Sequence, residues 1–241
     1  MSTELLLAIS LVVAFCGGLI RGVTGFGGSM VMTPAFSLLF DPRQVVPTVL
    51  LLETLAALPM LRSALREAEL RFIATSCLVA VLTVPLGSAL LASLDVQVLR
   101  YWIAGTVLTF SLLLLAKFRY NGPRNQVMSG AVGALSGVLL GGTGIGGPPM
   151  IIYLLSSDAP IRITRASLTL FVSLISVAGL VMLWYNDLLT FTGEMSPVSI
   201  GPAFYLGIIV GVRCFHHLSE KAFRQVTLVF LILISIITFL R

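Results

Sequence analysis

Two glycine-rich stretches stand out in a chain that is otherwise mostly apolar. GVTGFGGSMVMTP begins at Gly22 and GGTGIGGPPM begins at Gly141, and each lies between apolar runs. Glycine tolerates positive φ and lets backbone N–H groups approach a ligand closely. The free N–H groups at the start of a following helix carry partial positive charge and bind anions. The two stretches are therefore predicted to form one small anion site.

Two charged residues lie where charge is costly. Arg21 precedes the first stretch, and Glu53 is the only carboxylate in the middle of an apolar run, VLLLETLAALP. A charge at membrane depth usually faces a cavity or a partner. Arg21 is predicted either to hold the anion, or to snorkel or pair with an acid such as Glu53. Glu53 is predicted either to carry a coupling proton or to form a fixed salt bridge.

Threonines accompany the glycines, and their hydroxyls are predicted to bind an oxyanion, to cap the following half-helices, or both. The candidate substrate-binding residues are Arg21, Gly22, Thr24, Gly25, Gly27, Gly28, Gly141, Thr143, Gly144, Gly146 and Gly147. The competing interpretation is that these glycines only permit close helix packing. Neither stretch ends in Gly-Lys-Ser/Thr, so a phosphate-binding P-loop is not predicted.

The sequence gives little support for a metal site, a cofactor or enzymatic catalysis. Cys16, Cys77 and Cys214 are isolated, and the adjacent His216 and His217 do not share a helix face, so neither a metal site nor a cofactor is predicted. The apolar runs hold neither a carboxylate pair nor an H-E-x-x-H motif, which argues against an intramembrane enzyme.

Composition defines the class of protein. Of 241 residues, 57% are apolar and 10% are charged, and mean hydropathy is +1.05. A soluble domain carries about 25% charged residues, so an all-α polytopic membrane protein in a lipid bilayer is predicted. The net charge of +5 lies in short loops and does not favour nucleic-acid binding. The start, MSTE, lacks the basic residues of a signal peptide, so the first apolar run is expected to be retained.

The apolar runs predict two kinds of helix. Full spans are expected at 45–61, 72–93, 98–117, 163–185, 197–215 and 222–240. The runs 29–40, 126–140 and 148–157 are too short to cross and are expected to be half-helices. They would form broken or re-entrant hairpins at 4–40 and 126–157, each bent at a glycine stretch.

An internal duplication relates the two halves. A shift of 119 positions superimposes Gly18, Gly22, Thr24, Gly25, Gly27 and Gly28 on Gly137, Gly141, Thr143, Gly144, Gly146 and Gly147. The repeats are 1–120 and 121–241. Basic residues cluster near 62–71, 117–124, 162–165 and 213–224, whereas the loop at 186–194 has none, so the basic loops are expected inside. One hairpin and three spans per repeat then make the halves inverted, with both termini periplasmic.

The duplicated GVTGFGG and GGTGIGGPP stretches resemble those of the TauE/SafE sulfite exporters, a family also called sulfonate-uptake permeases. The dipeptides Leu86-Gly87 and Leu206-Gly207 and the arginines Arg100 and Arg224 resemble the same pattern. In the first stretch Ser29 and Met30 stand where the second has two prolines. The resemblance implies transport of sulfite, sulfonates or related organosulfur anions across a bacterial inner membrane.

Together these features predict a secondary transporter that works by alternating access. The small anion would be held at mid-membrane by the two glycine-rich tips, and transport would be coupled to a proton or sodium gradient. The alternatives are a permease for another solute such as a carboxylate, and a non-transport membrane scaffold or receptor. Short loops throughout the chain argue against the scaffold.

Overall fold

The computed structural model describes residues 3–25, 27–118, 120–156, 160–191, 195–214, 228–229 and 231–238. Within these residues the secondary structure is all-helical. The labelled helices are α1 (Thr3–Thr24), α2 (Gly28–Ser37), α3 (Pro42–Glu67), α4 (Leu70–Ser93), α5 (Val96–Leu115), α6 (Gln126–Thr143), α7 (Gly147–Leu154), α8 (Ile161–Tyr185) and α9 (Pro197–Cys214). Residues 228–229 and 231–238 are helical too, whereas 222–227, 230 and 239–240 of the last predicted span lie outside the described residues.

Six of these helices, α1, α3, α4, α5, α6 and α8, are long and apolar enough to cross a membrane, and α9 is a shorter apolar helix. Many large apolar side chains on their outer faces are exposed, including Val12, Leu82 and Val198. Such a surface is stable against lipid and not against water. The chain is therefore a multi-pass membrane protein.

One predicted length is wrong. The run 126–140 was expected to be a half-helix, but α6 has 18 residues and is long enough to cross. The helix continues through Gly141 and Gly142 because both pack against neighbouring helices. A Cβ on Gly141 would collide with the backbone of Val84 in α4, and one on Gly142 with the ring of Trp102. Each hairpin therefore joins one long helix to one short helix.

Two long helix pairs frame the molecule. α1 packs along α9, and α4 packs along α6. Glycines allow the backbones to approach in both pairs, as is common between membrane helices: a Cβ on Gly22 would lie 3.1 Å from the Cα of Gly211, and one on Gly141 would lie 3.1 Å from the backbone carbon of Gly87. α3 and α8 pack against each other between these pairs. The interior is therefore built around contacts between the two halves of the sequence.

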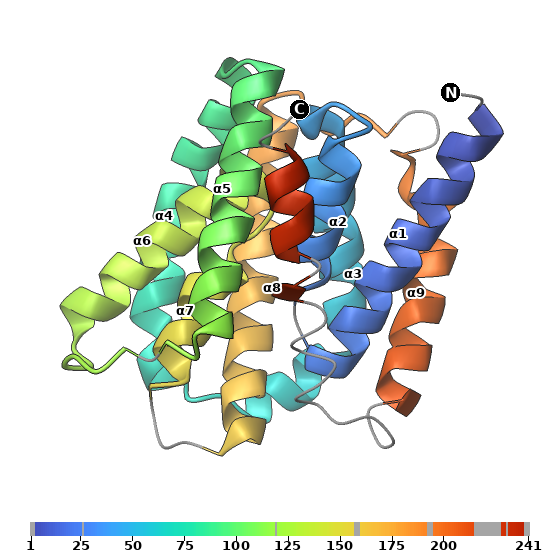
Figure 1. The fold of residues 1–241 in the computed structure, drawn as a ribbon. Coiled ribbons are helices and arrows are strands. Elements are labelled where there is room, and N and C mark those ends of the chain that lie inside the picture. Colours follow the sequence, from blue (N-terminus) through green and yellow to red (C-terminus); the bar gives the residue numbers. More distant parts are fainter. Residues whose placement is uncertain are drawn as a thin grey trace.

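The two hairpins open to opposite faces. In Figure 1, α1 runs downward and α2 returns to the top, whereas α6 runs upward and α7 returns to the bottom. α1 and α2 pack against each other, as do α6 and α7. The glycine-rich turns therefore lie inside the molecule rather than at either face.

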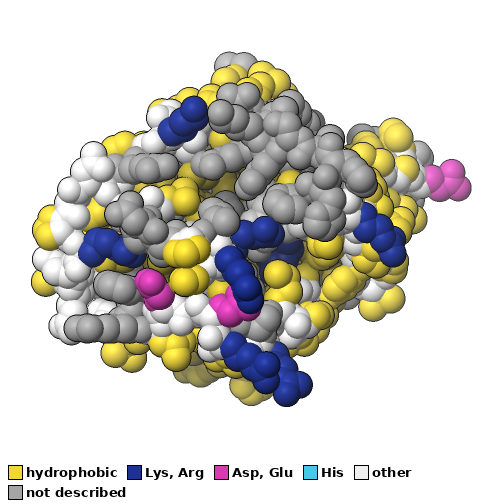
Figure 2. Space-filling view, turned by 90° about the horizontal axis from the view of Figure 1, so that it is seen from below, with side chains coloured by type: hydrophobic (Ala, Val, Ile, Leu, Met, Phe, Trp, Pro, Cys, Tyr) yellow, Lys and Arg dark blue, Asp and Glu magenta, His cyan; other side chains and the backbone are white. Residues whose placement is uncertain are grey.

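Basic side chains gather on one face, which Figure 2 shows from below. The ends of α3, α5 and α9 and the starts of α6 and α8 lie at the bottom of Figure 1. Those helix ends and their flanking residues carry Arg62, Arg66, Lys117, Arg124, Arg162, Arg165 and Arg213. Arg119, Glu194, His216, His217, Lys221 and Arg224 lie outside the described residues. We call this surface the basic face.

Candidate functional site

A small cavity lies between the two glycine-rich turns. Its volume is about 20 Å³, room for a single water molecule. The lining residues are Arg21, Gly27, Ser29, Met30, Leu50, Glu53, Leu140, Gly144, Gly146, Gly147, Pro148, Val172 and Ser176. Both turns and both half-helices contribute, so the structure brings together the two stretches that the sequence singles out. We call this space the central cavity.

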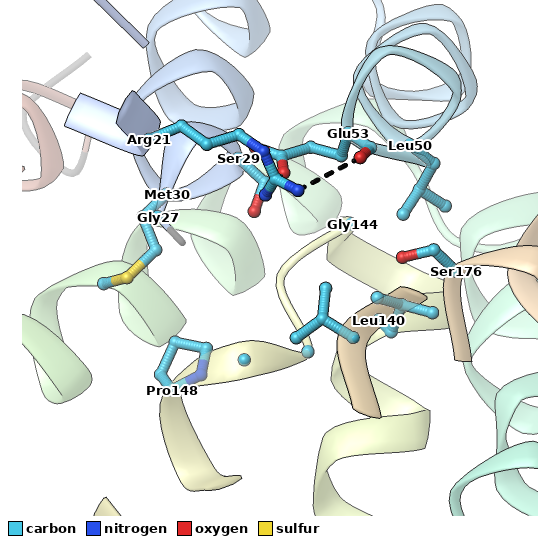
Figure 3. A pocket seen from close by; sticks show the side chains of 13 residues that line it. Arg21, Gly27, Ser29, Met30, Leu50, Glu53, Leu140, Gly144, Pro148 and Ser176 are labelled. Atoms are coloured by element: carbon cyan, nitrogen blue, oxygen red, sulfur yellow. Dashed lines mark hydrogen bonds and ion pairs between the residues drawn. The ribbon is translucent and has the colours of Figure 1, made fainter. Parts of the chain in front are cut away.

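Equivalent positions of the two halves face one another across the central cavity. Four pairs of lining residues differ by 119 in number: Arg21 and Leu140, Gly27 and Gly146, Ser29 and Pro148, and Glu53 and Val172. Figure 3 shows Arg21 and Glu53 on one side of the cavity and Leu140 and Pro148 on the other. Arg21 and Glu53 make one side of the cavity charged, whereas Leu140 and Pro148 opposite them are apolar.

The turns depend on glycine for their backbone geometry. Gly25, Gly27 and Gly144 have φ of 81°, 89° and 71°, values that L side chains adopt only with strain. Gly27 and Gly146 are the N-caps of α2 and α7, and no side chain caps either helix. The N-terminal N–H groups of the half-helices are therefore not taken up by a capping side chain.

The threonines do not cap the half-helices, so that part of the prediction is wrong. Thr24 Oγ1 donates to the Ile20 carbonyl oxygen at 2.8 Å, and Thr143 Oγ1 donates to the Leu139 carbonyl oxygen at 2.6 Å. Each hydroxyl bonds back to the preceding helical turn, a common alternative for threonine at the end of a helix.

The charged side of the cavity is a buried ion pair. Arg21 Nη1 donates to Glu53 Oε2, and Arg21 Nη2 donates to the Glu53 carbonyl oxygen at 3.2 Å (Figure 3). Arg21 is 6% exposed and Glu53 is 4% exposed. The pairing of Arg21 with Glu53, one of the roles predicted for this arginine, is therefore present in the structure. Such a pair is costly to break by removing one partner, by about 3–5 kcal/mol.

The Glu53 carboxylate also lies at the N-terminus of α2. A Cβ on Gly28, the first residue of that helix, would collide with Glu53 Oε1, and the Ser29 backbone N–H faces the carboxylate. Negative charge is favourable at this end of a helix. Within the protein, Glu53 therefore occupies the place that the first tip offers to an anion.

Two polar atoms at the central cavity lack a hydrogen-bond partner among the described residues. They are Glu53 Oε1 and Ser176 Oγ. Ser176 is 1% exposed, and Figure 3 shows its hydroxyl turned toward the interior of the cavity. Buried polar atoms are rarely left unpaired, and exceptions need a reason such as a ligand or water. The cavity therefore has unused polar capacity.

The predicted site residues fall into three places. Arg21, Gly27, Gly144, Gly146 and Gly147 line the central cavity, and Gly28 contacts Glu53 beside it. Gly22 and Gly25, with Arg21, line a second cavity toward the basic face. Gly141 packs on α4, and Thr143 bonds to its own helix, as Thr24 does.

Sequence reasoning missed Ser29 and Ser176. Among the described residues there is no cluster of three or more His, Cys, Asp or Glu that would suit a metal ion.

Broken helical hairpins from opposite faces that meet at a partly charged cavity are typical of membrane transporters. A sequence model described as "Sulfite exporter TauE/SafE" matches residues 10–238. The chain therefore belongs to the TauE/SafE sulfite exporter family, and it is a membrane transporter rather than an enzyme. Comparisons with curated proteins and with solved structures gave no match.

Proposed function

We propose that the protein is a secondary transporter that carries a small organosulfur anion, such as sulfite or a sulfonate, across a bacterial inner membrane by alternating access. One observation carries the proposal: a buried arginine and the N-terminus of a half-helix meet in the central cavity, and both are occupied by an internal carboxylate. These are the groups that recognise an oxyanion.

An inverted repeat is the architecture that this mechanism uses. Its support is that the hairpins open to opposite faces and that equivalent residues of the two halves line one cavity. The helix pairs add to this, because α1 with α9 and α6 with α4 are the same pairing once the repeats are exchanged. Rocking of one repeat against the other would open the central cavity to each face in turn.

The anion would take the place of the Glu53 carboxylate. One sulfonate oxygen would accept from Arg21 Nη1, which now donates to the Glu53 carboxylate, and another would accept from the Ser29 backbone N–H, which faces the same carboxylate. Ser176 supplies a further donor from α8. Sulfite has four non-hydrogen atoms, so it needs more room than the water-sized cavity gives while the ion pair is closed. Binding therefore requires the pair to open.

This exchange gives Glu53 a role in coupling. A carboxylate displaced from Arg21 in a low-dielectric interior is too costly to leave charged, and it takes up a proton instead. Each anion that displaces Glu53 would then travel with a proton. A sodium-coupled mechanism would instead need oxygen ligands for the ion, and Glu53 is the only carboxylate among the residues that line the central cavity.

The direct test is transport by purified protein in liposomes. We expect uptake of [³⁵S]sulfite that is driven by an imposed proton gradient, unaffected by sodium, and inhibited by methanesulfonate. Glu53→Gln should abolish the response to the proton gradient. Glu67→Gln is the matched control, because it alters another glutamate of α3 that lies outside the span. Inhibition by acetate rather than by methanesulfonate would identify a carboxylate permease. If no probe crosses the membrane, the alternative of a non-transport membrane scaffold would be favoured.

Orientation is tested separately. We propose that the basic face is cytoplasmic, following the distribution of arginine and lysine, which puts both termini in the periplasm. Thr190 follows α8 and Lys117 follows α5, and these two helices end at opposite faces, so a cysteine at each is expected to be labelled from one side of the membrane only. A membrane-impermeant thiol reagent added to intact cells should label Thr190→Cys and spare Lys117→Cys. The reverse result would invert the assignment.

A further inference from the structure

A second, larger cavity adjoins the first. Its volume is about 210 Å³, against about 20 Å³ for the central cavity. It is lined by Arg21, Gly22, Gly25, Ala56, Met60, Arg165, Ile208 and Val212. Arg21 lines both cavities, so the two spaces meet at this residue. We call the larger space the vestibule.

The vestibule lies toward the basic face. Arg165 is in the first turns of α8 and Val212 is in the last turn of α9, and these two helix ends are on that face, whereas Gly25 follows the end of α1 inside the molecule. Met60 and Val212 are 43% and 52% exposed, whereas Arg21 is 6% exposed. The vestibule thus leads inward from partly exposed residues to the buried arginine.

The charged residues that the structure describes around the vestibule have one sign. Among the described lining residues two are arginines and none is a carboxylate, and Glu53 lines the central cavity instead. A cleft lined by one sign of charge within apolar walls concentrates ions of the opposite sign. The other walls, Ala56, Met60, Ile208 and Val212, are apolar and suit a short hydrocarbon group. An organic anion with a small apolar tail matches both features.

We propose that the vestibule is an outer binding site for the transported anion, in which Arg165 and Arg21 hold an organosulfonate before it reaches the central cavity. The proposal rests on the proposed function for the identity of the substrate. The anion would reach Arg21 from the vestibule, which Glu53 does not line, so that Arg21 exchanges one partner for the other without being left unpaired. Arg165 is then a binding residue for the same reaction, one that no sequence motif marks.

Gly25 makes the position of Arg165 possible. A Cβ on Gly25 would lie 3.1 Å from both Nε and Nη2 of Arg165, and Gly25 also has positive φ. The guanidinium thus lies against the C-terminal end of α1, where positive charge is favourable. A purely structural role at that helix end predicts that loss of Arg165 lowers the yield of folded protein and leaves the substrate affinity of the folded fraction unchanged.

The first experiment measures the concentration dependence of [³⁵S]sulfite transport with the substrate presented at the basic face. We expect Arg165→Gln to raise KM by about tenfold, as for loss of a charge-assisted contact, with kcat little changed. Arg165→Lys should fall between it and the wild type. Arg162→Gln is the matched control, because Arg162 lies one turn earlier on α8 and pairs with Glu67 outside the vestibule. Equal KM values for Arg165→Gln and Arg162→Gln would overturn the proposal.

The second experiment does not depend on transport. Met60→Cys is introduced into a chain whose three native cysteines are replaced by alanine. Labelling rates are then compared for an anionic sulfonatoethyl and a cationic trimethylammonioethyl methanethiosulfonate. We expect the anionic reagent to be favoured, and butanesulfonate to slow its reaction. Arg165→Gln should abolish both effects, and an unchanged ratio of rates would overturn the proposal. If wild-type protein moves no probe anion while these labelling effects hold, the transport function fails and the vestibule site stands.

Discussion

The two glycine-rich tips have equivalent places in the two halves and different chemistry. At the first tip, α2 begins with Gly28, Ser29 and Met30, all of which carry backbone N–H groups. At the second, α7 begins with Gly147 followed by Pro148 and Pro149, so two of its first three N–H donors are missing. The proline-containing tip is preorganised for a helix start, but with fewer N–H groups we expect it to bind an anion less well.

The neighbouring side chains differ in the same direction. The first tip has Arg21 and Glu53, where the second has Leu140 and Val172. At the central cavity the first half therefore contributes the charges, and the second half contributes an apolar surface together with the hydroxyl of Ser176. A sulfonate with a short organic group would direct its head to the first tip and its tail to the second.

The strongest way to break this comparison is to give the first tip the chemistry of the second. Arg21→Leu or Glu53→Val alone leaves one buried charge unpaired and should destabilise the protein by about 3–5 kcal/mol. The double variant removes both charges and should restore much of the stability. Transport should be lost in all three variants. Thermal unfolding in detergent gives the stability, and sulfite flux in liposomes gives the activity.

A double variant that transports at the wild-type rate would show that charge at the first tip is dispensable. If the stability lost in the double variant equals the sum of the losses in the two single variants, Arg21 and Glu53 are not directly paired. Paired residues give non-additive losses.

The next largest effect comes from adding a methyl group at the start of each half-helix, which should affect stability differently at the two tips. Gly28→Ala places Cβ against Glu53 Oε1 and 3.1 Å from the Gly17 carbonyl oxygen, so it should cost about 1–3 kcal/mol in strain. Gly147→Ala meets only Val172 Cγ2, at an ordinary 3.5 Å, so it should fold like the wild type. Because that methyl still occupies the central cavity, Gly147→Ala should lose most of its transport. Unfolding midpoints and flux measured on both variants check this, and wild-type flux in Gly147→Ala would remove the second tip from the site.

Much of this arrangement could be predicted from the sequence, because glycine has few uses inside apolar runs. Repeated glycines at fixed spacing indicated both turns, and Arg21 and Glu53 stood out because charge is rare at that depth. The length of α6 was misjudged because a glycine such as Gly142 can either end a helix or let another helix pack closely. Only the contact with Trp102 separates the two cases.

Ser176 is a residue of the central cavity that the sequence does not single out. A serine in an apolar helix usually bonds to its own backbone, as Ser173 does to the Thr169 carbonyl oxygen at 2.6 Å. Ser176 looks the same in the sequence, but its Oγ is unpaired at the central cavity. Its position four residues after Val172, the equivalent of Glu53, puts it on the same helix face. That spacing was the available signal, and the cavity that gives it meaning depends on tertiary packing.

Exchanging N–H donors between the tips is a finer test. Ser29→Pro removes the N–H that faces Glu53, and we expect the fold to accept proline there because Ser29 is in the first turn of α2 and Pro148 has the corresponding place in α7. We expect a normal unfolding midpoint and a KM for sulfite raised about tenfold, as for a lost hydrogen bond to a charged group. Pro148→Ser adds a donor at the second tip and should lower KM slightly. An unchanged KM in Ser29→Pro would mean that the amides of the first tip do not bind the anion.

The smallest expected effect concerns Arg43 and Arg162, which are also 119 residues apart. Arg43 donates to the carbonyl oxygens of Leu91 and Leu94, at 3.3 and 2.7 Å, near the end of α4. Arg162 instead pairs with Glu67 and holds the pKa of that carboxyl below its usual range, through a hydrogen bond and its charge. A carboxyl whose pKa is lowered by folding stabilises the protein above its unfolded pKa, and this contribution is lost as pH falls through the folded pKa.

Glu67→Gln should therefore lower the unfolding midpoint slightly at about pH 7, and the difference should vanish as the medium is acidified below about pH 4. The effect is small because the pair is exposed to water. Arg43→Gln loses contacts with uncharged carbonyl groups, so its larger destabilisation, about 1 kcal/mol, should not change over the same range. Unfolding midpoints of both variants across that range decide between them. A pH-dependent difference for Arg43→Gln would show that the two arginines kept the same role after the duplication, and the division of labour between the halves would then be confined to the tips.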